Sequence, residues 1–82
     1  MKRVIILPNA LKLLRRYRSD AQRILAKVEA YAADPESQAN NVKTMKGGYG
    51  LRLRVGEFRV IFEETPDEII VTKIGPRGSV YD

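Results

Sequence analysis

The sequence predicts an α+β fold in which a pair of helices covers one face of a small, mainly antiparallel sheet. Three observations support this prediction. Apolar residues recur at helical spacing through residues 10–32, they alternate with charged residues through residues 51–63, and a short β-branched run precedes both segments. The order β-α-α-β-β-β gives two layers and a four-stranded sheet. A chain of 82 residues with 44% hydrophobic side chains suits a single domain, residues 1–82.

A strand followed by helical sequence makes up the N-terminal half. Residues 2–7 are rich in aliphatic side chains and stop at Pro8, which predicts the first strand. Between residues 10 and 32 the apolar side chains return every three or four positions, as on the buried face of a helix. Ser19 and Gln22 have the spacing of a capping box. We therefore expect the helical region to break into a hairpin of two helices near Ser19.

The second half predicts three strands separated by turns. Apolar and charged residues alternate over residues 51–55 and 58–63, on either side of a turn at Gly56 and Glu57. A further strand follows over residues 68–74. The segments between these elements are expected to form a polar connector, a glycine-rich turn and a C-terminal tail, at residues 36–41, 47–50 and 79–82.

Positive charge dominates the sequence and is unevenly distributed. Fifteen Lys and Arg residues outnumber ten Asp and Glu residues, which gives a net charge of +5. Basic residues dominate residues 1–27 and residues 43–59, whereas residues 60–72 carry only acidic charges. A basic region of this kind predicts an anionic partner.

The residue types that are missing exclude several kinds of chemistry. The sequence contains no cysteine and no histidine. This excludes disulfides, metal sites built on these residues, thiol nucleophiles and proton transfer by imidazole. We expect no metal and no other cofactor. The Val4–Leu7 apolar run is too short for a signal peptide or a membrane span, so we expect a soluble, cytoplasmic protein without membrane contact.

Strand alternation predicts a cluster of arginines on the uncovered face of the sheet. If Leu53 and Val60 face the helices, Arg52, Arg54 and Arg59 lie together on the opposite face. Like charges on neighbouring strands repel one another, so a compensating anion is expected. Two interpretations remain open: nearby glutamates neutralise a merely solvated face, or the face binds a phosphate backbone.

The segments LRVGEFRVIFE, at residues 53–63, and IGPRGSVY, at residues 74–81, are the most distinctive in the chain. Together with Met45–Gly47 and Ile69–Val71, they resemble the RelE/ParE toxin superfamily, and specifically its RelE-like branch. The resemblance covers most of the chain and implies a single RelE-like toxin domain with the microbial RNase-like RelE fold. It further implies the toxin of a type II toxin–antitoxin system, an mRNA interferase that cleaves mRNA in the ribosomal A site and so inhibits translation.

The same resemblance implies roles for individual residues. Arg59, Arg77 and Tyr81 match catalytic positions of a metal-independent endoribonuclease, in which the 2′-OH of the RNA attacks the adjacent phosphate. The arginines would clamp the phosphate, and the tyrosine would either take the 2′-OH proton or stack on a base. The positions implied to bind RNA are Lys46, Arg52 and Arg54.

The implied partners are a cognate antitoxin protein, the ribosome and mRNA, with operator DNA reached only through the antitoxin. Two other functions remain open, a ParE-like inhibitor of gyrase and a non-catalytic nucleic-acid-binding module. The sequence departs from the RelE-like pattern at Pro76, where many relatives have His or Lys, and at Gly50, which replaces a basic strand residue.

Overall fold

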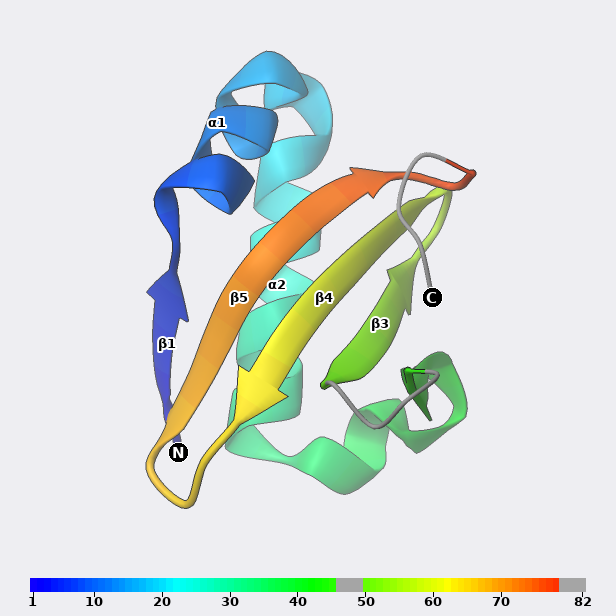
Figure 1. Ribbon diagram of the computed structural model, residues 1–82. Helices are drawn as coiled ribbons and strands as arrows, with labels where there is room; N and C mark the ends of the chain where they lie inside the picture. The colour runs from blue at the N-terminus through cyan, green and yellow to red at the C-terminus, as the bar shows by residue number, and fades with distance from the viewer. Residues whose placement is uncertain (46–49, 79–82) are drawn as a thin grey trace.

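A computed structural model of the chain describes residues 1–45 and 50–78, and within them a sheet of five strands lies against two α-helices. Figure 1 looks onto the open face of the sheet, with α2 behind β4 and β5. The strand order is β1-β5-β4-β3-β2; β1 is parallel to β5, and the other neighbours are antiparallel. The elements are β1 (Arg3–Ile6), α1 (Pro8–Arg16), α2 (Arg18–Ala33), the 3-10 helix η1 (Pro35–Asn41), β2 (Val42–Thr44), β3 (Leu51–Val55), β4 (Phe58–Glu64) and β5 (Glu68–Pro76).

The predicted α+β sandwich is confirmed, but the sheet has five strands where the sequence predicted four. The additional strand, β2, directly follows the predicted polar connector, which is the helix η1. Val42 lies opposite Leu53 in the register and packs against the core. A three-residue strand is too short to show an alternating pattern, so only its pairing with β3 defines it.

The two helices separate at Tyr17, two residues before the predicted break at Ser19. Tyr17 leaves the helical conformation (φ −108°, ψ 60°), and no side-chain hydrogen bond caps the start of α2. The prediction of a capping box at Ser19 was therefore wrong. The Tyr17 ring meets the ring of Phe58 edge-on, with 5.1 Å between centroids, and the Arg16 guanidinium lies 5.8 Å from the Tyr17 centroid. Aromatic packing against β4 accompanies the break at this position.

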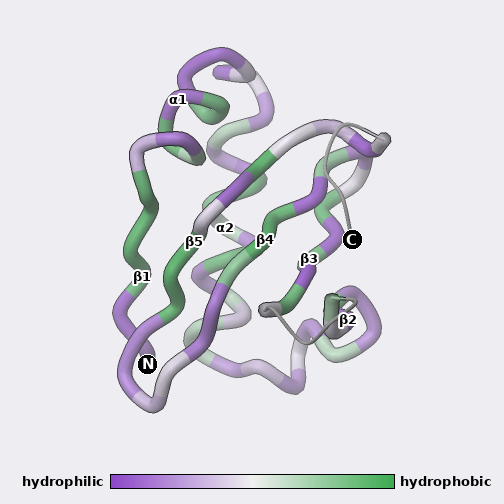
Figure 2. Tube along the Cα trace, viewed as in Figure 1, coloured by the Kyte–Doolittle hydropathy of each residue, from purple (hydrophilic) through white to green (hydrophobic). Residues whose placement is uncertain are grey.

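The core lies between the helices and the face of the sheet that the alternation predicted. Leu53 is 1% exposed and Val60 is fully buried, whereas Arg54 is exposed. In Figure 2 the hydropathy of the tube changes repeatedly along β3 and β4, as this alternation requires. The residues of the core cluster are Ala10, Leu14, Ile24, Val28, Tyr31, Ala32, Leu53, Val55, Phe58, Val60, Phe62, Ile69, Val71 and Ile74.

Ile61 is the exception to this two-sided pattern. Its position in β4 places it on the open face, yet it is only 7% exposed. In the register it lies between Arg52 of β3 and Lys73 of β5. Long basic side chains cover apolar neighbours with their aliphatic stems while their charges stay in water.

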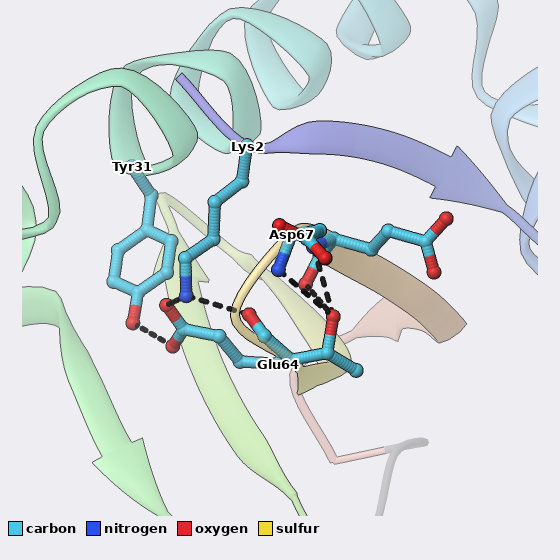
Figure 3. A network of polar contacts seen from close by, with 6 residues as sticks. Lys2, Tyr31, Glu64 and Asp67 are labelled. Carbon is cyan, nitrogen blue, oxygen red and sulfur yellow. Dashed lines mark hydrogen bonds and ion pairs between the residues drawn. The ribbon is translucent and has the colours of Figure 1, made fainter.

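A polar network closes one end of the core (Figure 3). Glu64 accepts hydrogen bonds from the Lys2 Nζ at 2.6 Å and from the Tyr31 hydroxyl at 2.5 Å. Burial raises the pKa of Tyr31 to about 12, and the hydrogen bond to Glu64 and the charge of Glu64 add to the rise. Burial alone would raise the pKa of Glu64, but the hydrogen bonds from Lys2 and Tyr31 outweigh it and leave this pKa lowered.

Gly50 occupies a position that excludes larger residues. Its φ of +102° is strained for residues with a side chain, and a Cβ there would lie 2.8 Å from the carbonyl oxygen of Phe62. The basic residue of the RelE-like pattern would meet the same obstacle in this backbone conformation. The rest of the predicted glycine-rich turn, residues 47–49, lies outside the described part of the chain.

Candidate functional site

Two pairs of basic residues face each other across the strands at one edge of the sheet. The register places Arg54 of β3 opposite Arg59 of β4, and Lys43 of β2 opposite Arg52 of β3. Directly opposed like charges are unfavourable in a sheet. The outer face of β2, β3 and β4 is therefore arranged to receive negative charge.

These side chains line two adjacent pockets on the open face and at its rim. One pocket has a volume of about 140 Å³ and the other of about 340 Å³. Arg54, Arg59 and Asn41 line both, so we treat the two as one site, called the cationic site below. The first pocket is lined by Asn40, Asn41, Lys43, Arg52, Arg54 and Arg59, and the second by Lys27, Asn41, Arg54, Val55, Gly56, Glu57, Arg59 and Arg77.

Arg59 lies close to three other arginines, Arg52, Arg54 and Arg77, whose charges act on it. Its Nη1 donates to the carbonyl oxygens of Gly56, at 3.4 Å, and Phe58, at 3.2 Å, which directs the guanidinium toward the β3–β4 turn. Partial burial lowers the pKa of Arg59, and the charges of Arg52, Arg77 and Arg54 lower it further, while Glu57 opposes them. A bound anion would relieve the part of this shift that comes from repulsion among the arginines.

Arg77 reaches the same site from the segment after β5. Its backbone N–H donates to the carbonyl oxygen of Glu57 at 2.6 Å, which ties this segment to the β3–β4 turn. The Arg77 side chain is exposed and lines the larger pocket beside Arg54 and Arg59. Arg77 is thus fixed through its backbone while its guanidinium is accessible to a ligand.

Arg54 is held from the other side by η1. Its Nη2 donates to the Asn41 Oδ1 at 3.4 Å. No carboxylate of the described residues forms an ion pair with Arg54, Arg59 or Arg77. For Arg54 and Arg59, no ion pair among the described residues supports the interpretation that glutamates neutralise the predicted arginines of this face, although Glu57 adds negative charge near Arg59.

Four of the six predicted site residues meet in the cationic site: Arg52, Arg54, Arg59 and Arg77. Lys46 and Tyr81 lie outside the described residues, so the structure does not place them. Among the other residues that line the site, sequence reasoning missed the basic and amide side chains of Lys27, Asn40, Asn41 and Lys43. A predicted β2 strand would have indicated Lys43, because its register opposes Arg52. Lys27 lies on a helix and the two asparagines on η1, where nothing in the sequence pattern pointed to the site.

The described residues contain no cluster of carboxylates suited to a metal ion and no helix long and apolar enough to cross a membrane. The polar side chains that line the cationic site are guanidinium, ammonium and amide groups, together with the Glu57 carboxylate. Guanidinium and ammonium groups bind phosphate and stabilise negative charge that develops during a reaction.

Comparison with known proteins relates the chain to a family. The family described as ParE toxin of type II toxin–antitoxin system, parDE, matches residues 4–81. No curated protein matches the sequence. Among solved structures, the archaeal RelE–RelB complex from Pyrococcus horikoshii OT3 has a similar fold, with a TM-score of 0.76 and 24% sequence identity. The alignment covers 96% of this chain and 98% of that chain.

Proposed function

This chain belongs to the ParE toxin family of type II toxin–antitoxin systems, within the RelE/ParE superfamily, and from this premise we propose that it is a ribosome-dependent endoribonuclease. One observation carries the proposal: Arg54, Arg59 and Arg77 meet in one accessible site without a carboxylate ion-pair partner among the described residues. A phosphodiester backbone is the ligand that such a site fits best.

The reaction requires no nucleophile from the protein. The 2′-oxygen of the RNA attacks the adjacent phosphorus, the bond from phosphorus to the 5′-oxygen breaks, and a cyclic phosphate results. Negative charge grows on the phosphate oxygens in the transition state, and fixed cations stabilise it. Arg59 and Arg77 are proposed to clamp this phosphate, because a guanidinium binds two oxygens at once.

Proton transfer is the second requirement. A base must take the 2′-OH proton and an acid must protonate the leaving 5′-oxygen. Tyr81 is proposed either to move the first proton or to stack on a base and orient it. Lys46, Arg52 and Arg54 are proposed to hold the flanking RNA. The ribosome supplies the remaining geometry, so we expect little cleavage of naked RNA.

A toxin of this kind requires a protein that blocks it in the host. We propose a cognate antitoxin with an acidic or amphipathic segment that covers the cationic site, and contact with operator DNA only through that antitoxin. The similarity to a chain of the archaeal RelE–RelB complex supports such a partner. Co-expression with the product of the adjacent reading frame should yield a co-purifying complex and relieve growth arrest; if neither occurs, that product is not the antitoxin.

A second candidate function is inhibition of gyrase. The family match carries the ParE description and supports this alternative, while the IGPRGSVY segment favours the RelE-like branch. A ribosome-dependent cleavage assay and a gyrase supercoiling assay on the same preparation separate the two. A non-catalytic nucleic-acid-binding module would show salt-sensitive affinity for RNA while mRNA stays intact.

Toe-printing of translated mRNA tests the principal proposal directly. Added protein should produce new 3′ ends at codons that occupy the ribosomal A site, and none when ribosomes are omitted. If mRNA stays intact and supercoiling by gyrase is lost, the protein is a gyrase inhibitor and the nuclease proposal is wrong.

A further inference from the structure

The helix η1 contributes two neutral amides, Asn40 and Asn41, to the cationic site. All other residues that line the smaller pocket are cationic. Lys and Arg donate hydrogen bonds but do not accept them, whereas an Asn side chain does both. The two amides therefore add a capacity that phosphate binding does not require.

Asn41 is engaged within the protein. Its Oδ1 accepts from the Arg54 Nη2, and its Nδ2 donates to the Gln38 Oε1, both at 3.4 Å. Gln38 is only 8% exposed and has non-helical backbone angles that bend η1. The chain of contacts runs from a buried amide through Asn41 to the guanidinium, so Asn41 acts as a positioning residue for Arg54.

Asn40 is exposed, lines the smaller pocket and has no side-chain hydrogen bond to any residue in the described part of the chain. Its amide oxygen and nitrogen are therefore both available to accept from and donate to a ligand. Phosphodiester oxygens are acceptors only, whereas the edge of a nucleobase presents donors and acceptors side by side. The pocket of about 140 Å³ is smaller than the ~300–1,000 Å³ of sites that enclose a whole small molecule, and it suits one portion of an extended strand.

We infer that Asn40 is a specificity-determining residue that reads the edge of one unstacked base while the neighbouring cations hold the phosphates. Adenine is the expected base, because an amide pairs with its N6 amino donor and adjacent N7 acceptor, whereas guanine presents two acceptors, N7 and O6, on the corresponding edge. Sequence-specific proteins recognise single-stranded RNA through splayed-out bases in this way. The inference rests on the proposed function in one respect, namely that the ligand is RNA.

Binding of four 2′-O-methyl oligoribonucleotides, each built from a single base, tests this inference by fluorescence anisotropy. These probes cannot undergo attack by the 2′-oxygen, so the measurement requires neither cleavage nor a ribosome. The wild-type protein should bind the adenine oligomer at least about five-fold more tightly than the uracil oligomer, the lower end for a bidentate amide–base contact.

The Asn40→Ala variant should lose this preference and keep its salt dependence, because the cations remain. Asn41→Ala should weaken the binding of all four probes to a similar extent, because it removes the hydrogen bond that holds Arg54. Asn9→Ala is the matched control: this asparagine is exposed on α1 and does not line the cationic site. It should leave both affinity and preference unchanged.

The inference is overturned if the wild-type protein shows no base preference, if Asn40→Ala retains it, or if Asn40→Ala weakens all four probes equally. The last result would assign Asn40 to backbone contact. Failure of the proposed function is a separate outcome, because a protein that leaves mRNA intact on the ribosome can still show a base preference that depends on Asn40.

Discussion

Arg54 and Arg59 lie directly opposite each other on adjacent antiparallel strands, and neither forms an ion pair with a carboxylate of the described residues. Their repulsion costs stability in the absence of a ligand. The same arrangement provides two fixed guanidiniums where a phosphate would bind, so the unfavourable pair in the free protein becomes favourable in a complex.

The two faces of β3 should respond very differently to substitution. Leu53 is 1% exposed in the core, so Leu53→Ala should lower the free energy of unfolding by about 2–5 kcal/mol. Arg54→Ala should change it by no more than about 0.5 kcal/mol, because the side chain is exposed and opposes another cation. Urea unfolding measures both. Equal losses would mean that the assigned faces are wrong.

Arg59 and Arg77 should affect the chemical step more than binding. Replacing either by Ala should raise the barrier to cleavage by about 2–4 kcal/mol, as expected when one preorganised donor is lost, with a smaller change in ribosome affinity. Single-turnover cleavage on programmed ribosomes gives the rate. Lys73→Ala is the control, since Lys73 is exposed on β5 and lines neither pocket of the cationic site.

Substitutions at Tyr81 should separate its two proposed roles. If the hydroxyl moves the proton, Tyr81→Phe should abolish most cleavage. If the ring only stacks on a base, Tyr81→Phe should be mild and Tyr81→Ala severe. Should Arg59→Ala, Arg77→Ala and Tyr81→Ala all fold normally and keep wild-type toxicity, the nuclease proposal is wrong and a binding module replaces it.

Tyr31 should contribute stability that alkaline pH removes. Its pKa rises from an ordinary value of 10.0 to about 12 in the folded protein, with burial as the largest cause. A raised folded pKa gives stability that is complete below pH 10 and is lost as pH rises toward about 12. Tyr31→Phe should therefore lack this decline in urea unfolding between those values. Tyrosinate absorbance should lose a step near pH 12 in this variant.

Gly50→Ala should destabilise the protein more than Gly78→Ala. Both glycines have positive φ, +102° and +92°, so both substitutions incur the backbone cost of about 1–2 kcal/mol. A Cβ at Gly50 would in addition meet the Phe62 carbonyl oxygen at 2.8 Å, whereas a Cβ at Gly78 meets nothing within 4 Å. Thermal unfolding compares the two variants. Equal effects would show that Phe62 moves aside at little cost.

Much of the candidate site was predictable from local sequence. The alternation of Leu53 with Arg52 and Arg54 specified which side chains of β3 point away from the core, because a strand repeats every two residues. The resemblance to a toxin family added Arg77, which lies outside any such pattern, and the structure places it in the same site. Chemical composition alone excluded histidine and cysteine chemistry.

The sequence by itself thus determined the two-layer fold, the buried face and the residue types of the cationic face, since these depend on periodicity within single elements. Only the tertiary structure decided the break at Tyr17, the strand β2 and the contribution of Lys27 and Asn41 to the site. Each of these depends on contacts between segments distant in the chain. No periodic signal in the sequence marks these features. The Tyr17 ring packs against another layer, β2 has only three residues, and Lys27 and Asn41 line a pocket formed mainly by other elements.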